Sequence, residues 1–253
     1  MSIEIQSEIE ERLSKFPDRS SRVLQDGFLE LEDSWGDETT IVNTARLSVS
    51  NRRVEKVEDM SQRDIDLLHH LLKNNHGTPF ETVYFRFRIV APIFVMRQWV
   101  KHRISTWNEF SMRYRKPIDL FYIPSKEALE YHDTLLMSDS QTVEYIDLMN
   151  QVFRFYHDQY EASKKEIDER LEWSEDERKM ARARLREVLR CALPVSSYSD
   201  VFWTVNFRSL MNFFDLRAKE GAQYEMRQYA LEAMRLTEKR LPLLMKIYHE
   251  VKG

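Results

Sequence analysis

Glycine is scarce in this sequence. Among 253 residues there are only five glycines, at positions 27, 36, 77, 221 and 253, and no two of them are close together. The backbone loops that cradle a dinucleotide or a nucleoside triphosphate need clustered glycines, so the sequence excludes both kinds of loop. If this protein binds a phosphate group, side chains rather than backbone amides must hold it.

Cysteine and long apolar runs are also rare. The single cysteine, Cys191, excludes an intrachain disulfide framework and fits a reducing compartment. We expect its side chain to be buried as a small hydrophobic residue. No apolar run reaches the length of a membrane span, and the acidic start MSIEIQSEIEERLSKF lacks the apolar core of a signal peptide. No HExxH or Cys/His set accompanies the histidines, so we expect no metal site. We therefore expect a cytoplasmic protein without a membrane partner.

Positive charge is concentrated in one segment. The chain as a whole carries a net charge of −4, which argues against general nucleic-acid binding. Residues 86–116, however, include eight Lys or Arg residues and one acid, Glu109. The C-terminal end of a helix favours one or two cations, but this does not account for Arg103, Arg113 and Arg115 in the stretch that follows.

This segment has two interpretations. Guanidinium groups near Asn108 and Ser111 favour binding of a phosphate or another anion, and neighbouring aromatic residues such as Trp107 and Tyr114 offer flat faces for a heterocycle. A nucleotide supplies both an anion and a ring. A cationic surface loop packed by its own aromatic residues explains the pattern equally well.

Apolar periodicity predicts an α+β fold, with a mainly antiparallel sheet flanked by helices in a single domain. Alternating residues indicate a strand over 83–89, a weaker edge strand over 26–33 and another strand from Ser199. Helices are expected over 1–20 (or a loose arm), 39–50, 61–75, 92–103, one or two parts of 126–171, 174–193, 206–217, from Gln223, and from Pro242. Residues 103–117 are expected to be irregular.

Several polar residues have a structural explanation beside a functional one. His102 is a lone histidine after an apolar helix, which is typical of a structural hydrogen-bonding group. Ser111 has no histidine base near it in the sequence, so we interpret it as a ligand contact rather than a nucleophile. His76 and Glu81 flank a turn that they could equally well stabilise.

Four arginines recur at every fourth residue from 178 to 190. Such a row is typical of a solvated helix face paired with acids such as Glu175, Glu177 and Glu187. Arg190 stands out because it ends the row beside the turn Cys-Ala-Leu-Pro.

The motifs, taken together, resemble the flavin-dependent thymidylate synthases. His102-Arg103, followed after seven residues by Ser111, is similar to that family's R-H-R-x7-S signature. Further similar blocks follow the family's order: HGTPFE (76–81), APIFVMRQW (91–99), NEFSMRY (108–114), FYIP, LRCALP (189–194), FWTVNFRSLMNFFDLRA (202–218) and AQYEMRQYA (222–230). The resemblance implies a thymidylate synthase domain over 26–253, preceded by an N-terminal extension over 1–25.

Two positions depart from the family pattern. Lys101 stands where the signature has its first arginine, and a lysine keeps the charge but loses the planar, two-pronged donor. Gly221 stands where relatives often have a histidine.

The resemblance implies reductive methylation of dUMP to dTMP. The carbon would come from 5,10-methylenetetrahydrofolate, FAD would carry the hydride, and NADPH would reduce the FAD. It also implies a homotetramer with shared active sites and no nucleic-acid partner. The alternatives are another flavin-dependent NADPH oxidoreductase on the same scaffold, or a non-catalytic nucleic-acid-binding module that uses residues 86–116.

The resemblance carries residue roles over position by position. The implied FAD contacts are Ser48, His76, Thr78, Lys101, His102, Arg103, Glu109, Asn206, Arg208 and Asn212. The implied dUMP pocket comprises Gln98, Lys101, Glu109, Phe110, Ser111, Met112, Arg113, Arg190 and Arg217, in which Arg113 and Arg190 would hold the phosphate. Arg208 and Asn212 are four residues apart, so one face of a helix can present both.

Arg217 is the catalytic residue that the resemblance implies. The uracil ring must become electron-rich at C5 before it can attack a carbon electrophile. A guanidinium beside N3 and its carbonyl stabilises the negative charge that develops there. Arginine cannot act as a base at neutral pH, so its role is to stabilise the anion.

Overall fold

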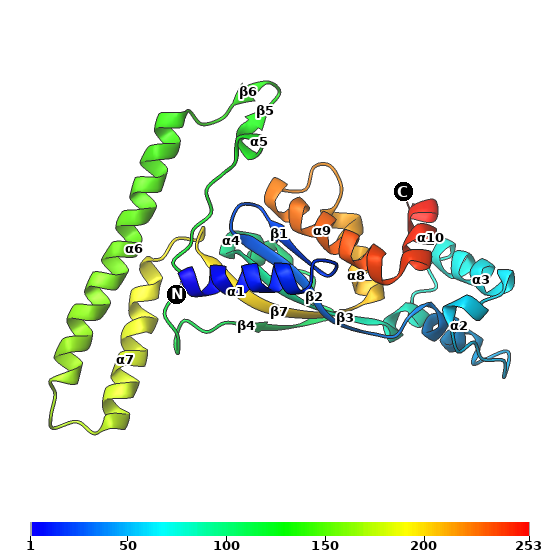
Figure 1. The fold of residues 1–253 in the computed structure, drawn as a ribbon, viewed down its shortest axis with the longest axis horizontal. Helices are drawn as coiled ribbons and strands as arrows, with labels where there is room; N and C mark the ends of the chain where they lie inside the picture. The colour runs from blue at the N-terminus through cyan, green and yellow to red at the C-terminus, as the bar shows by residue number, and fades with distance from the viewer. Residues whose placement is uncertain (1, 253) are drawn as a thin grey trace.

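A five-stranded antiparallel sheet forms the centre of the computed structural model, which describes residues 2–252. The strands lie in the order β1 (Ser20–Val23), β2 (Gly27–Trp35), β3 (Tyr84–Pro92), β7 (Tyr198–Asn206) and β4 (Ser105–Glu109). Helices pack against this sheet (Figure 1). The structure confirms the α+β fold with an antiparallel sheet.

Ten α-helices occur within the described residues. They are α1 (Ser2–Lys15), α2 (Glu38–Arg46), α3 (Gln62–Lys73), α4 (Ile93–Trp99), α5 (Lys126–Leu129), α6 (Asp139–Asp168), α7 (Glu175–Leu189), α8 (Phe207–Arg217), α9 (Tyr224–Arg240) and α10 (Pro242–Lys252). Short connections include the 3-10 helices η1 (Val57–Asp59), η2 (Thr78–Thr82) and η3 (Arg190–Ala192), and the small hairpin of β5 (Glu130–Tyr131) and β6 (Thr134–Leu135). None of the helices within residues 2–252 combines the length and the apolar character needed to cross a membrane.

Several strands differ from the prediction. β5 and β6 form a small hairpin within residues 126–171, which the sequence predicts to be helical. β2 is an interior strand rather than an edge strand, because the four residues of β1, too few to give a clear alternating signal, pair with its outer side. Residues 105–109, expected to be irregular, form β4, which runs along β7 from Ser105 opposite Val205 to Glu109 opposite Val201. The polar sequence STWNE is acceptable there, because an edge strand with a solvated face needs no continuous apolar pattern.

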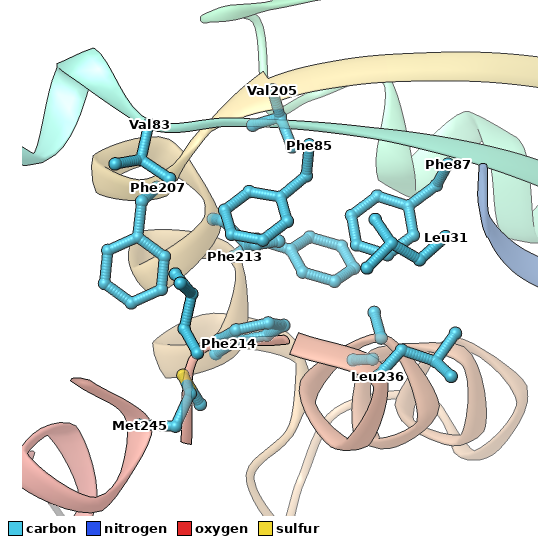
Figure 2. Close-up of a cluster of buried hydrophobic side chains, with 14 of the residues drawn as sticks. Leu31, Val83, Phe85, Phe87, Val205, Phe207, Phe213, Phe214, Leu236 and Met245 are labelled. Atoms are coloured by element: carbon cyan, nitrogen blue, oxygen red, sulfur yellow. The ribbon is translucent and has the colours of Figure 1, made fainter. Parts of the chain in front are cut away.

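One face of the sheet carries the main core, which Figure 2 shows in part. Phe85 and Phe87 of β3 point from the sheet toward α8 and α9. Phe213 of α8 is fully buried, and its ring centroid lies 5.0 Å from that of Trp99 and 5.1 Å from that of Trp203. This aromatic packing fixes α8 against β7 and α4.

The N-terminal helix packs on the opposite face. Ile5 and Ile9, one helical turn apart on α1, pack with Phe28 of β2. Two positions along the same strand, Glu30 is fully buried, and Arg12 of α1 binds its carboxylate at 2.5 Å. The first helix and strand therefore belong to the same packed layers as the rest of the sheet.

Helices α6 and α7 form a long hairpin beyond one end of the sheet, opposite the end where α2 and α3 lie (Figure 1). The two helices pack against each other. Tyr145 of α6 donates its hydroxyl proton to the carbonyl of Tyr122 at 2.7 Å, and the rings of Phe121 and Phe153 lie 5.9 Å apart. These contacts from the first half of α6 attach the hairpin to the body of the protein.

Replacing Phe213 with alanine tests the importance of the aromatic packing. The deleted ring would leave a cavity, so we expect Phe213→Ala to lose about 3–5 kcal/mol of unfolding free energy. Phe155 on α6 is 51% exposed, and the matched variant Phe155→Ala should change stability by no more than about 0.5 kcal/mol. Urea denaturation followed by tryptophan fluorescence measures both values, and equal losses would contradict the assignment of the core.

Candidate functional site

A cavity of about 560 Å³ lies where β7 joins α8, beside the turn that leads into β4. Its lining comprises Glu81, Lys101, His102, Arg103, Ile104, Asn206, Arg208, Ser209, Asn212, Leu216 and Arg217. Four of these side chains are Lys or Arg and one is acidic. The cavity therefore has a net positive lining, which favours an anionic ligand.

The junction of β7 and α8 positions three of the polar side chains. Asn206 ends the strand and caps the helix, because its Oδ1 accepts the backbone N–H of Ser209 at 2.9 Å. Arg208 and Asn212 follow on α8 and both line the cavity, as their spacing of four residues predicts. The sequence identifies this capped helix correctly, since a side-chain cap is a local signal.

The turn after α4 differs from the prediction. The sequence predicts a helix over 92–103, on which Gln98, Lys101 and His102 share one face. The helix instead ends at Trp99, so Lys101 and His102 lie in the turn that follows. Their backbone N–H groups donate to carbonyls only three residues back, at 3.3 and 3.0 Å, and the chain turns to enter β4.

Arg217 and His102 are in direct contact inside the cavity. The Nε–H of Arg217 donates to Nε2 of His102 at 3.1 Å. Burial lowers the pKa of His102 to about 4, and the charge of Arg217 adds to this effect. His102 is therefore neutral at physiological pH and accepts a hydrogen bond at Nε2, while the ring packs edge-on against Phe213 at 5.0 Å.

Arg208 is held between the η2 turn and its own helix. Its Nη1 lies 2.5 Å from Oε1 of Glu81. A Cβ atom at Gly77 would lie only 2.5 Å from its Nε, so a larger residue there would displace the Arg208 side chain. The neighbouring residues His76 and Thr78 are thereby placed beside Arg208, although neither is among the residues lining the cavity.

Ser48 lies apart from the cavity lining. The helix predicted over 39–50 ends at Arg46, and Ser48 is exposed in the loop beyond it. Arg46 pairs with the buried carboxylate of Asp64 on α3. This ion pair ties the end of α2 to α3 and leaves the loop after Arg46 on the surface.

A second cationic group lies at the other end of β4. Phe110, Ser111, Met112 and Arg113 follow the strand, and the hydroxyl oxygen of Ser111 accepts the backbone N–H of Arg113 at 3.3 Å. Arg190 follows α7 directly as its C-cap and has an exposed side chain. Within the described part of the chain, none of these residues lines the cavity.

The length of β4 separates the two groups. Lys101, His102 and Arg103 precede the strand, and the Phe110–Arg113 stretch follows it. Five residues of extended chain span about 16 Å. The structure therefore brings the implied site residues into two groups on one chain rather than into one pocket.

Gln98 and Glu109 are both held by hydrogen bonds. Gln98 donates its amide N–H to the carbonyl oxygen of Gln223, and Gln223 donates to Glu225 at 2.9 Å. Gln223 accepts through its carbonyl oxygen and donates through its amide nitrogen, so the carbonyl oxygen of Gln98 takes no part in this chain of bonds. Glu109 accepts the hydroxyl proton of Ser199 at 2.7 Å.

The two departures from the family pattern have different settings. Lys101 is exposed at the cavity, where its flexible ammonium group takes the place of a guanidinium fork. Gly221 adopts a φ of +89°, and nothing lies within 4 Å of the position a Cβ would take. Glycine supplies the left-handed backbone conformation of this turn, without a steric requirement from neighbours.

Several contacts of the site are invisible in the sequence. Gln223, the residue before α9, accepts from Gln98, which lies 125 positions earlier in the chain. Glu187 binds Arg113 across 74 positions, and no local pattern marks either pairing. Cys191 lies in η3 and is exposed, so the expectation of a buried cysteine is wrong.

Fold and site together define an α+β protein whose arginine-rich cavity suits a phosphorylated ligand. Residues 30–243 match the family described as thymidylate synthase complementing protein. The flavin-dependent thymidylate synthase of Thermosipho africanus is 37% identical to this chain, over 87% of this chain and 90% of its own length. That of Kosmotoga olearia is 36% identical, over 90% of this chain and 92% of its own length. The chain belongs to the flavin-dependent thymidylate synthase family, and it is therefore an enzyme, a methyltransferase.

A solved structure has the same fold. The UMP/dUMP methylase PolB from Streptomyces cacaoi, bound with 5-Br dUMP, superposes with a TM-score of 0.70 at 24% sequence identity. The likeness covers 91% of this chain and 97% of that protein. It extends through the whole sheet and its helices rather than through a single motif.

The contact between His102 and Arg217 leads to a prediction about titration. We expect His102 to titrate near pH 4 by NMR, and its pKa to rise in Arg217→Ala while staying below 6.5, because burial is the larger cause. The unfolded state binds this proton more readily than the folded state, so His102 contributes stability above about pH 6.5 that is lost as the pH falls toward 4. A midpoint at or above 6.5 in the native protein would contradict this geometry.

Proposed function

We propose that this chain methylates dUMP to dTMP with FAD as its bound cofactor, 5,10-methylenetetrahydrofolate as carbon donor and NADPH as reductant. The observation that carries the proposal is the contact of Arg217 with a neutral histidine in a cationic cavity. A reaction that passes through a uracil anion requires such a fixed and uncompensated cation. Family membership supports the substrate and the flavin.

The cavity residues fit a flavin dinucleotide. Lys101, Arg103 and Arg208 would hold its phosphates, and the side-chain amides of Asn206 and Asn212 would hydrogen-bond its polar groups. Binding by side chains agrees with the absence of a glycine-rich loop from the sequence. When bound, the flavin supplies the electrons that reduce the transferred carbon to a methyl group.

Arg217 would act on the uracil ring. As C5 becomes nucleophilic, negative charge develops at N3 and the adjacent carbonyl, and a guanidinium placed there stabilises it. The Nε–H of Arg217 is bound to His102, so the two terminal amino groups are the ones that would meet the ring. His102 carries no charge in this pairing and therefore does not weaken the field of the guanidinium.

Arg113 and Arg190 would bind the phosphate of dUMP. Both follow elements that end at the same region, Arg113 after β4 and Arg190 at the end of α7. The pKa of Glu187, which binds Arg113, is lowered by the arginines at 184, 113 and 190, so positive charge surrounds this carboxylate. Such a cluster of guanidinium groups suits a phosphate dianion. Ser111 would add a hydroxyl donor.

The separation of the two groups supports a shared active site. Phosphate-binding residues at one end of β4 and flavin-binding residues at the other would meet if a second copy placed its Phe110–Arg113 stretch against this cavity. A homotetramer with sites shared between subunits is therefore part of the proposal. Ser48, His76 and Thr78, which lie outside the cavity lining, would contact the cofactor in that assembly. The partners are small molecules in the cytoplasm rather than nucleic acid.

Two measurements test the proposed activity. The visible absorption spectrum of the purified protein should show bound flavin, and C5-tritiated dUMP should release its label when methylenetetrahydrofolate and NADPH are present. A protein that only oxidises NADPH would show the flavin without releasing tritium. A colourless protein that binds both DNA and dUMP, with affinities that fall steeply as salt is added, would instead indicate a nucleic-acid-binding module.

The variant Arg217→Ala should lose methylation while keeping its fold and its flavin. Removing a group that stabilises developing charge lowers kcat by about 10²–10³-fold. Single-turnover rates, the flavin absorbance of the variant and its melting temperature check this together. Near-normal turnover would rule out the assigned role.

The variant Arg113→Ala should weaken dUMP binding by about 30-fold or more, because charge-assisted hydrogen bonds contribute about 2–3 kcal/mol. Flavin affinity should change far less, since the proposal assigns Arg113 to the phosphate of dUMP and not to the flavin. Calorimetric titration with dUMP and FAD measures both. An unchanged dUMP affinity would exclude Arg113 from the phosphate site.

A further inference from the structure

The last turn of α7 holds Arg113 at two points. The Nε of its side chain lies 2.8 Å from Oε1 of Glu187. Its backbone carbonyl accepts the Nε–H of Arg186 at 2.8 Å. Arg190 lies three and four residues beyond these two helix residues, so all three share one face of α7.

We propose that Glu187 and Arg186 are positioning residues that hold Arg113 beside Arg190, so that the two arginines form one phosphate site. The inference rests on the proposed function, because it takes Arg113 and Arg190 as the phosphate ligands. It assigns a role to the α6–α7 hairpin, which otherwise stands beyond the end of the sheet (Figure 1).

The geometry of the Glu187 contact suits positioning. The carboxylate binds the Nε of Arg113, which leaves the two terminal amino groups in their fork for a phosphate. Its second oxygen accepts from Nη1 of Arg184 at 2.9 Å. Both oxygens of Glu187 are thus engaged, and the carboxylate is fixed in one orientation.

Arg186 is fixed in turn by the hairpin. Its Nη1 donates to the hydroxyl of Tyr160 on α6 at 2.7 Å, and Tyr160 is buried. One guanidinium therefore bridges α6, α7 and the backbone of Arg113. This bridge prevents the carbonyl of Arg113 from rotating away, because both ends of Arg186 are occupied.

The rest of the loop after Arg113 is attached to α6 in the same way. Lys116 binds Glu161 at 2.8 Å, and His157 binds Asp119 at 2.7 Å. Four polar contacts therefore link residues 113–119 to the hairpin, counting those of Arg186 and Glu187. A surface loop held by a single exposed ion pair would be only weakly ordered, whereas a set of contacts to two packed helices fixes it.

Positioning and simple charge effects predict opposite results. Replacing Glu187 by glutamine removes a negative charge from a cluster of arginines, which by electrostatics alone would strengthen the binding of an anion. If Glu187 positions Arg113, the same replacement weakens binding, because glutamine offers one acceptor oxygen to two arginine donors, Arg113 and Arg184, and holds the guanidinium of Arg113 less firmly. Whether dUMP affinity rises or falls in Glu187→Gln therefore distinguishes a positioning role from a purely electrostatic effect.

The test measures binding of dUMP to the flavin-loaded protein by calorimetry, with deoxyuridine as a probe that lacks the phosphate. We expect Glu187→Gln to weaken dUMP binding about tenfold and to leave deoxyuridine binding unchanged. The value of kcat at saturating dUMP, the flavin content and the melting temperature should stay near those of the parent. Glu187→Asp, which keeps the charge with a shorter reach, should fall between the parent and Glu187→Gln.

Glu175→Gln is the matched control. Glu175 lies on the same helix and binds an arginine in the same way, Arg182 at 2.6 Å, but it is 12 residues or about 18 Å from Glu187 along the helix axis. This variant should leave dUMP affinity unchanged. An equal loss in both variants would mean that any charge on α7 has the effect, and would overturn the proposal.

A double variant shows whether Glu187 acts through Arg113. In the Arg113→Ala background, Glu187→Gln should weaken dUMP binding no further, because the side chain that it positions is gone. If Arg113→Ala weakens binding but Glu187→Gln leaves it unchanged or strengthens it, the positioning role is wrong and the phosphate site stands. If Arg113→Ala itself has no effect, the proposed phosphate site fails.

Discussion

The pairing of β4 with β7 places the cationic side chains at the two ends of β4. It puts the turn with Lys101 and Arg103 beside the start of α8, and it carries the chain away from that cavity before Arg113. β4 lies at the edge of the sheet, so within the described residues its outer side pairs with no other strand. The site chemistry therefore depends on an edge strand of five residues with little apolar signal of its own.

The arginines of the site differ in the charge of their partners. Arg208 and Arg113 bind carboxylates, those of Glu81 and Glu187, which hold the guanidinium groups but also offset their charge. Arg217 binds a neutral imidazole, so it is held without being neutralised. An arginine that binds a ligand dianion tolerates a counter-ion beside it, whereas one that must stabilise a single developing charge is more effective without one.

The sequence was informative wherever structure is decided locally. The alternation in β3 and the helices predicted over 206–217 and 174–193 rest on signals within a few residues, and the structure has an element at each of these places. The end of α4 and the edge strand β4 depend on pairing with β7, about 100 residues away. The local sequence pattern contains no signal of this pairing. The same limit applies to the candidate site. The cavity gathers Arg208, Asn212 and Arg217 on one helix face, as their spacing suggests, but the contacts of Gln98 and Arg113 are made by residues from distant segments.

The two ends of the α6–α7 hairpin differ in how many contacts they make with the rest of the protein. Its contacts with the 113–119 loop involve the later part of α6 and the last turn of α7, while the turn over 169–174 that joins the helices makes only exposed contacts such as Arg170 with Glu172. Insertions or deletions in that turn would change the outline of the molecule while sparing the catalytic apparatus. The turn is accordingly a natural place for sequence drift, and for attaching a reporter group to a working enzyme.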